Sequence, residues 1–242
     1  MTTIDLGGLK VKNKLVVGIH QPDFIPYIGY FYKIAKSNIF VFLDDAQFSN
    51  DNMHHWNSIK TPQGQFNLKV PVKHHFGDLI NEVNFRNEMN WQKKHLKTIS
   101  MNYGRAKHFD TIFPKFQKLI NANYENLALM NISINQFICN EFGFDTEFVL
   151  SSDLNIHSFK EDRVIDICTK LNAETYLSGH GAKSYQKESN FNKKNIHLEY
   201  TKYHSFKYKQ QWNEFIPDLS ILDYIFNHGF DWGLIESNNL ED

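Results

Sequence analysis

The stretch LVVGIHQPDFIPYIGYFYKIAKSNIFVFLDD, residues 15–45, decides the fold of this chain. Residues 15–20 and 39–43 are short apolar runs rich in β-branched side chains, a pattern that predicts two buried strands. Between them, a loop with prolines and a glycine leads into residues 30–36, where the apolar residues have helical spacing. A strand, a loop, a short helix and a strand form a right-handed crossover, so we expect the two strands to be parallel.

The remaining sequence extends this pattern on both sides of a helical middle third. Residues 56–61 and 65–72 flank the turn Pro62 to Gly64 and predict a β-hairpin with Leu68, Val70 and Val72 facing inward. Apolar residues spaced by about 3.6 predict three helices, at residues 91–102, 111–121 and 127–142. Gly143 is expected to end the last of these helices.

Alternation of strands and helices then returns. Strands are predicted at residues 147–150, 175–177 and 196–200, with a helix at 161–171 and a short helix around Tyr185. We therefore predict an α/β fold with a Rossmann-like, mostly parallel sheet and a helical insertion in the middle third. The expected organisation is one domain over residues 1–242, with a helical subregion at about 88–143.

Composition narrows the class of function. The 242 residues are 41% hydrophobic and 15% aromatic, with 21 Phe, so aromatic side chains are available beyond the core for a pocket or a homodimer interface. A net charge of -1 and a pI near 6.9 argue against binding to DNA or to an anionic membrane.

Cysteine usage and hydrophobicity address metals and membranes. Cys139 and Cys168 each lie in a predicted amphipathic helix with no second cysteine nearby, and the histidine pairs lack the spacing of zinc ligands. We therefore expect no structural zinc and no permanently bound metal. Residues 1–14 lack the apolar core of a signal peptide, and no stretch approaches the roughly 18 to 20 apolar residues that span a bilayer. We expect a cytoplasmic protein.

The first candidate site is the loop after the opening strand, with His20, Gln21, Gly29 and Tyr30. Ligands of open α/β sheets bind at the carboxyl ends of parallel strands, where helix N-termini present free N–H groups to phosphates. Gly29 would let a phosphate approach the backbone, and His20 could bind it or act as acid or base. The alternative is a hydrogen-bonded histidine at a strand end, with prolines that only shape a turn.

The second candidate is Ser178, Gly179, His180 and Gly181, which also follow a predicted buried strand, with Tyr185 close behind. Two glycines around a histidine suit the close approach of a polar ligand, although a tight turn would have the same sequence. Because both loops follow strands of one expected sheet, we predict that they meet around one cleft.

The third candidate follows the strand at residues 39–43. Asp44 and Asp45 could hold Mg²⁺ on a nucleotide or orient an amine, and Lys60 could neutralise a phosphate. Gln47 and Asn57 are expected to contact the substrate. The alternative is that the two acids form a solvated strand end.

Five segments carry a resemblance to a known family: IHQPDFIPYIGYF, VFLDDAQFS, NSIKTPQG, YLSGHGAKSY and WNEFIPDLSILDYIFNHG, at residues 19–31, 41–49, 57–64, 176–185 and 212–229. With them the chain resembles the WbqC-like family over nearly its whole length. Residues 19–45 are also similar to the opening unit of the HUP superfamily of nucleotide-binding domains, with His20 at the first histidine of the signature. Tyr30 stands where that superfamily has its second histidine, and WbqC-like proteins often have Ser at the position of His180.

The WbqC-like resemblance implies an enzyme of O-antigen or other surface-polysaccharide synthesis, an amide-forming transferase or ligase that adds glycine or a similar acyl unit to a nucleotide-linked amino sugar. His20, Asp45 and Lys60 would be catalytic, and Gly29, Gly179 and Gly181 would bind the nucleotide or activated carboxylate. Activation as an adenylate requires ATP and Mg²⁺, whereas an aminoacyl-tRNA donor does not.

Two alternatives remain open. The HUP resemblance implies a nucleotidyltransferase that releases pyrophosphate. A nucleotide-sugar binding protein without catalysis would use aromatic side chains to stack on the sugar, among them Phe206, Tyr208 and Trp212.

Overall fold

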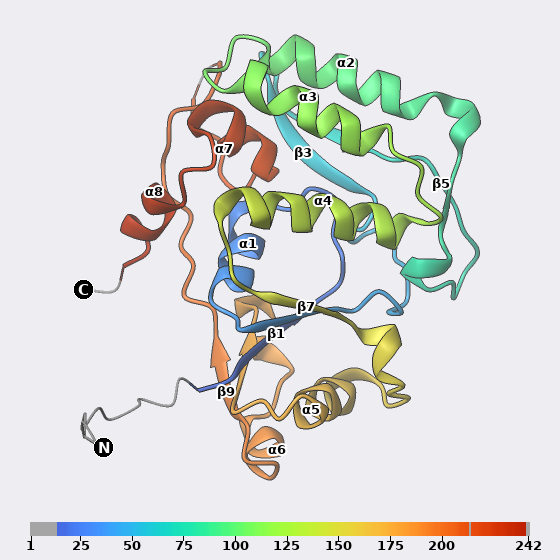
Figure 1. Ribbon diagram of the computed structural model, residues 1–242, viewed down its shortest axis with the longest axis vertical. Helices are drawn as coiled ribbons and strands as arrows, with labels where there is room; N and C mark the ends of the chain where they lie inside the picture. Colours follow the sequence, from blue (N-terminus) through green and yellow to red (C-terminus); the bar gives the residue numbers. More distant parts are fainter. Residues whose placement is uncertain (1–13, 213, 241–242) are drawn as a thin grey trace, which may run out of the picture.

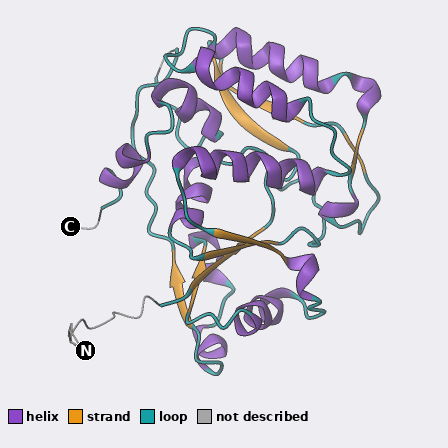
Figure 2. Ribbon diagram, in the orientation of Figure 1, coloured by secondary structure: helices purple, strands orange, loops and turns teal. Residues whose placement is uncertain are grey.

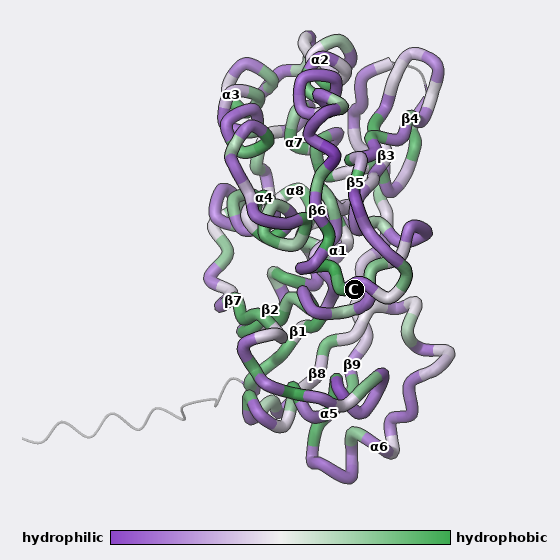
Figure 3. The backbone as a smooth tube through the Cα atoms, turned by 90° about the vertical axis from the view of Figure 1, so that its right-hand side faces the viewer, coloured by the Kyte–Doolittle hydropathy of each residue, from purple (hydrophilic) through white to green (hydrophobic). Residues whose placement is uncertain are grey.

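The computed structural model describes residues 14–212 and 214–240. Its centre is a five-stranded sheet, whose strands are labelled one after another across the middle of Figure 3. The strand order is β7 (Glu147–Leu150), β2 (Ile39–Phe42), β1 (Val16–His20), β8 (Thr175–Ser178) and β9 (His197–Tyr200). All four neighbouring pairs are parallel, which confirms the predicted α/β fold with a Rossmann-like sheet.

The order of the strands places a topological switch point at the centre of the sheet. From β1 the chain moves outward through β2 to β7, and it then returns to the other side of β1 to form β8 and β9. The connections after β1 and β8 therefore leave the sheet in opposite directions. In open α/β sheets a crevice forms at such a point, outside the carboxyl ends of the two strands.

Helices cover both faces of this sheet, as Figures 1 and 2 show. Phe40 and Phe42 face the larger apolar core, which includes α1 (Ile28–Ala35). Val17, Ile19 and Val41 face the other side and belong to a second core with α5 (Lys160–Lys170) and α6 (Glu188–Asn192). Strands buried on both faces need continuous apolar runs, which explains the sequence of β1 and β2.

The middle third is helical, as predicted. It contains α2 (Trp91–Tyr103), α3 (Phe109–Ile120) and α4 (Leu127–Phe142), which lie on the α1 side of the sheet (Figure 1). Gly143 ends α4 with a positive φ of 77°, a conformation that glycine adopts without steric cost.

Small antiparallel elements precede these helices. The predicted hairpin is formed by β3 (Trp56–Thr61) and β4 (Gly64–Lys69), and Leu68, Val70 and Val72 are buried as expected. Val72 belongs to a separate short strand, β5 (Val72–Lys73), which pairs with β6 (Asn84–Phe85). Pro71 has no N–H to continue the β4 ladder, which accounts for the interruption.

The structure adds elements that the sequence pattern did not indicate. These are the C-terminal helices α7 (Ile221–His228) and α8 (Trp232–Ser237), and the 3-10 helices η1 (Ile80–Glu82), η2 (Asn87–Met89), η3 (Ser151–Leu154) and η4 (His180–Ser184). The helix expected around Tyr185 is divided between η4 and α6, with Tyr185 between them. Within the described residues, no helix combines the length and apolar character needed to cross a bilayer.

A substitution in β1 tests the packing of the sheet. A Cβ atom at Gly18 would lie 2.4 Å from Ser37 Oγ and 3.0 Å from a ring carbon of Phe40. We predict that Gly18→Ala lowers the free energy of unfolding by about 1–3 kcal/mol in urea titrations, because the core there is fully packed. Gly181→Ala is the matched control, since no atom lies within 4 Å of its added Cβ. Equal stability of the two variants would contradict this packing.

Candidate functional site

The three predicted loops leave the sheet at one rim. His20 is level with Phe42 in the register of β1 and β2, and Gly18 is level with Leu177 of β8. Because these strands are parallel, the residues after His20, Phe42 and Ser178 emerge at the same edge. The loops near positions 20, 45 and 180 therefore share the rim that contains the switch point.

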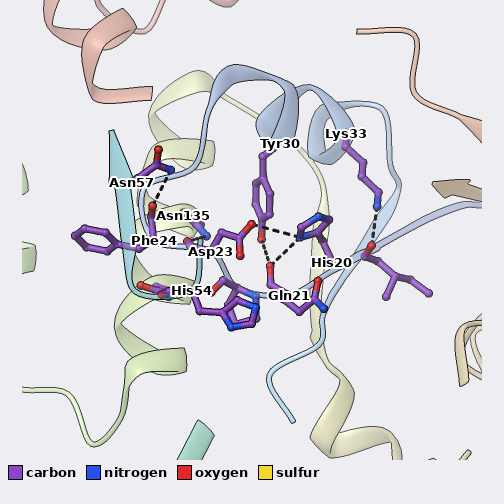
Figure 4. A network of polar contacts seen from close by, with 12 residues as sticks. His20, Gln21, Asp23, Phe24, Tyr30, Lys33, His54, Asn57 and Asn135 are labelled. Carbon is purple, nitrogen blue, oxygen red and sulfur yellow. Dashed lines mark hydrogen bonds and ion pairs between the residues drawn. The ribbon is translucent and has the colours of Figure 1, made fainter. Parts of the chain in front are cut away.

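The loop after β1 is held by asparagine side chains along four consecutive backbone carbonyls (Figure 4). Asn131 and Asn135 of α4 donate to the carbonyls of Pro22 and Asp23 at 2.8 and 3.1 Å. Asn57 of β3 donates to the next two, Phe24 and Ile25. The Nδ2 of Asn131 also donates to the carbonyl of His54 at 2.7 Å, which ties a second loop to the first.

Asn57 thus has a different task from the one expected. Asn57 is buried, and its side-chain amide donates to two backbone carbonyls of the loop after β1. The amide therefore positions this loop and is not exposed to a substrate. One of these carbonyls belongs to Ile25, whose φ is 38°. A β-branched residue rarely adopts this conformation, so the surrounding contacts must stabilise it.

His20 projects from the end of β1 with one ring nitrogen fixed. Its Nδ1 lies 3.1 Å from the carbonyl oxygen of Gln21, and the hydroxyl of Tyr30 donates to the same oxygen at 2.8 Å. Because a carbonyl only accepts hydrogen bonds, Nδ1 carries the proton and Nε2 keeps its lone pair. The Tyr30 ring packs edge-on against the imidazole, and 37% of the His20 side chain is exposed. The rim therefore presents an oriented imidazole with an available base.

Asp23 is a site residue that the sequence analysis did not single out. Its carboxylate Oδ2 lies 3.7 Å from Nδ1 of His20, and the side chain is mostly buried (Figure 4). Burial raises the pKa of Asp23 to about 7. The only sequence signal was its place between Pro22 and Phe24 in the first family segment, where an acid is equally typical of a solvated turn.

The neighbouring basic groups are also desolvated. Burial and the charge of Lys33 lower the pKa of His20 to about 3, and burial lowers the pKa of His54 to about 4. Lys33 donates from α1 to the carbonyl of Ile19 at 2.6 Å, and burial lowers its pKa to about 7. The site therefore combines neutral imidazoles with a carboxyl group and an amine that both titrate near neutral pH.

Gly29 packs against aromatic side chains and leaves no open space for a ligand. A Cβ atom there would lie 2.5 Å from the Tyr27 ring and 2.7 Å from the Tyr203 ring. The glycine is needed for the packing of these aromatic side chains against α1, and not for the approach of a phosphate as expected. Tyr30, its neighbour, does contribute through Gln21 and His20.

The two acids after β2 lie on the rim but are already paired. Asp44 is buried and accepts hydrogen bonds from Ser152 N and Oγ at 3.1 and 2.7 Å. Asp45 accepts from Ser151 Oγ and forms an ion pair of 2.5 Å with Arg163. Their oxygens hold the β2 and β7 loops together, so this pair does not fit a magnesium ion, and Asp45 is not available as a base. Gln47, also a predicted substrate contact, is exposed and pairs with Leu79 in an isolated bridge.

Lys60 is placed away from the rim, in a polar cluster under the C-terminal segment. Its amine donates to Gln210 Oε1 at 2.9 Å and to the carbonyl of Glu214 at 2.5 Å. Its backbone N–H donates to Tyr103, whose hydroxyl donates to buried Asp223 at 2.8 Å. The expected role of Lys60 on a leaving anion is therefore not supported by its position.

Trp212 lies near this cluster and not at the rim. Its indole N–H donates to the carbonyl of Asn102 at the end of α2, and 40% of the residue is exposed. A sugar stacked on Trp212 would be bound apart from His20.

The loop after β8 reaches the rim with little side-chain bulk. Ser178 is buried and donates to Gln186 at 2.8 Å, whereas His180 and Tyr185 are exposed. No atom lies within 4 Å of a Cβ added to Gly179 or Gly181. Their binding role stays a prediction, and the open space beside both glycines is compatible with it. Among the described residues no group of three His, Cys, Asp or Glu side chains is arranged to hold a metal ion.

Comparison with known proteins identifies the family of this chain. The model of the WbqC-like protein family matches residues 21–233. A relative from Mycobacterium tuberculosis (strain ATCC 25618 / H37Rv), described as the uncharacterized protein Rv1507c, is 34% identical over 217 residues, which are 88% of this chain and 94% of the relative. No solved structure matches the chain.

The asparagine contacts generate a stability prediction. Asn131→Ala removes the donor for two buried carbonyls, so we expect a loss of about 1–3 kcal/mol in the free energy of unfolding, measured in urea. Asn140→Ala is the control, because Asn140 lies on the same helix but is exposed. A loss of the same size in both variants would mean that the loop does not depend on Asn131.

The raised pKa of Asp23 generates a prediction of pH dependence. A carboxyl group with a folded pKa of about 7 and an unfolded value of 3.8 binds more protons in the folded state between these pH values, so its contribution to stability falls as the pH rises through this window. In the wild type this loss of stability amounts to about 1.4 kcal/mol for each unit by which the pKa is raised. We predict that the Asp23→Asn variant lacks this loss when thermal unfolding of both proteins is measured between pH 4 and 7. Parallel pH profiles for the two proteins would show that the pKa of Asp23 is not raised.

Proposed function

We propose that this chain, which belongs to the WbqC-like protein family, is an amide-forming transferase or ligase that acts on an amino sugar at the rim of its sheet. The acyl unit is glycine or a similar aminoacyl group, and the acceptor is a nucleotide-linked amino sugar of surface-polysaccharide synthesis. The observation that best supports the chemistry is the orientation of His20 by the Gln21 carbonyl, with the Asp23 carboxyl group 3.7 Å from the same ring nitrogen.

His20 Nε2 would act as the general base. When the amine of the sugar attacks the activated acyl carbon, a C–N bond forms and the C–O bond to the leaving group breaks. The proton of the amine passes to Nε2 and then to the leaving oxygen or to solvent. In its ionised form Asp23, close to the protonated Nδ1, would offset part of the burial that disfavours the imidazolium formed in this step. In this proposal His20 alone takes the proton, because Asp45 is paired with Arg163.

The second rim loop would bind the anionic part of the reactants. Gly179 and Gly181 leave space for a phosphate near the backbone, and this loop follows β8, the neighbour of β1 at the switch point. Adenylate activation requires ATP with Mg²⁺ supplied with the nucleotide, and aminoacyl-tRNA would replace both.

A nucleotidyltransferase is the second candidate, favoured by the strand order and by the position of His20 at the end of β1. The structure gives Tyr30 a role that differs from a second catalytic histidine, because its hydroxyl is bound to Gln21 and its side chain is buried.

An assay with a nucleotide-linked amino sugar, glycine and ATP, and in parallel with glycyl-tRNA, separates the candidates. An amide product detected by mass, with pyrophosphate when ATP is used, supports the proposal. Pyrophosphate with a nucleotidylated product supports the second candidate. Tight binding of the sugar nucleotide without turnover indicates a binding protein and contradicts both.

The matched variants test His20 itself. We predict that His20→Ala abolishes amide formation, while its free energy of unfolding stays within roughly 1–2 kcal/mol of the wild type. His157→Ala is the control, since His157 is an exposed histidine outside the proposed site. Full activity of His20→Ala would exclude His20 as the base.

A further inference from the structure

A cavity of about 380 Å³ lies outside the rim site, between the β4–β5 segment, η2 and the loop at residues 50–55. Its volume is within the range of small-molecule pockets. Pro71 and Met89 are among its apolar lining residues, and polar side chains also reach it. The cavity therefore offers both an apolar wall and hydrogen-bonding groups.

His55 is the unusual residue of this cavity. Its side chain lines the cavity and the residue is fully buried, yet neither ring nitrogen has a hydrogen-bond partner in the described structure. A buried polar group without a partner costs about 1–3 kcal/mol, so such groups normally have one. Because the ring is fully buried, a ligand in the cavity would supply this partner after a small displacement of the lining side chains.

Apart from the neutral Asn50, the other polar side chains of the cavity are basic. Lys69 of β4, Arg86 after β6 and His74 after β5 line it, and no Asp or Glu is among the described lining residues. The Arg86 Nε donates to the carbonyl of Val72 at 3.0 Å, which fixes the base of the guanidinium. Lys69 also acts on His55, since burial first and the charge of Lys69 next lower the pKa of His55 to about 4. At neutral pH this imidazole is therefore neutral and offers one donor and one acceptor.

We propose that this cavity binds the oxyanion of a small organic molecule, a carboxylate or a phosphate ester, between Arg86, Lys69 and the ring of His55. Guanidinium and ammonium groups supply charge-assisted hydrogen bonds to such an anion. The His55 ring N–H donates to one oxygen, and the apolar part of the molecule lies against Pro71 and Met89.

The inference does not depend on the reaction at the rim, although the two sites are neighbours. Phe48 contacts the ring of His54 with a centroid distance of 5.7 Å and the rings of His55 and His74 at 5.2 and 4.7 Å. His54 belongs to the loop that Asn131 ties to the rim loop. A ligand in the cavity would therefore contact residues whose neighbours line the rim site.

The test is an NMR titration of the intact chain, labelled with ¹⁵N in the histidine rings. The probes are phenyl phosphate, benzoate and the neutral benzyl alcohol. We expect the His55 ring signals, assigned with a His55→Gln variant, to shift with at least one of the anions and not with benzyl alcohol. Binding of the phosphate alone identifies a phosphate ester site, binding of benzoate alone a carboxylate site, and similar binding of both a general oxyanion site.

Lys69 and Arg86 are exposed, so substitutions at these two positions test anion binding without disturbing the apolar core. We predict that Arg86→Gln and Lys69→Gln each raise the Kd of the bound anion about tenfold, because each removes a charge-assisted contact. Lys73→Gln is the control, since Lys73 is an exposed neighbour in β5 that does not line the cavity and lies 3.8 Å from Glu88. The proposal is overturned if neither anion shifts the His55 signals at millimolar concentration, or if Arg86→Gln and Lys69→Gln leave the Kd unchanged.

Discussion

The geometry of the candidate site depends on the hydrogen bonds from three asparagine side chains to the loop after β1. This loop turns into the protein interior, where backbone carbonyls cannot be solvated and must find donors. Asn131, Asn135 and Asn57 supply these donors along the four carbonyls of residues 22–25. The helical insertion therefore has a structural function at the site, because α4 carries two of the three amides. These hydrogen bonds fix the loop that contains Asp23 and begins directly after His20.

Burial gives the site its chemical character. Desolvation moves the pKa of a carboxylic acid up and that of a base down, and both directions occur within one loop. The result is an imidazole that is neutral under ordinary conditions and a carboxyl group, on Asp23, that titrates near neutrality. Opposed pKa shifts of neighbouring groups are typical of sites that transfer protons. The position at the switch point of a parallel sheet favours the functional interpretation.

The sequence predicted the sheet, the helical middle third and the common rim because these depend on local periodicity and on the rule that crossovers join parallel strands. It could not predict which polar side chains point inward. Asn57 and Lys60 have the residue types of a binding site, but both are buried by long-range contacts. Asn57 contacts residues 24 and 25, and Lys60 contacts residues 210 and 214. Asp23 was missed for the converse reason, since its burial depends on packing between segments more than 100 residues apart, as its bond from Asn135 illustrates.

In the proposed function, the loops after β1 and β8 bind one ligand between them. The most direct measurement is a crystal structure of the chain soaked with a nucleotide-linked amino sugar, with and without ATP. We expect electron density for the ligand to span the rim, with its phosphates beside Gly179 and Gly181 and its amino group within hydrogen-bonding distance of His20 Nε2. Density at another face of the protein, or a ligand that contacts neither loop, would contradict this expectation.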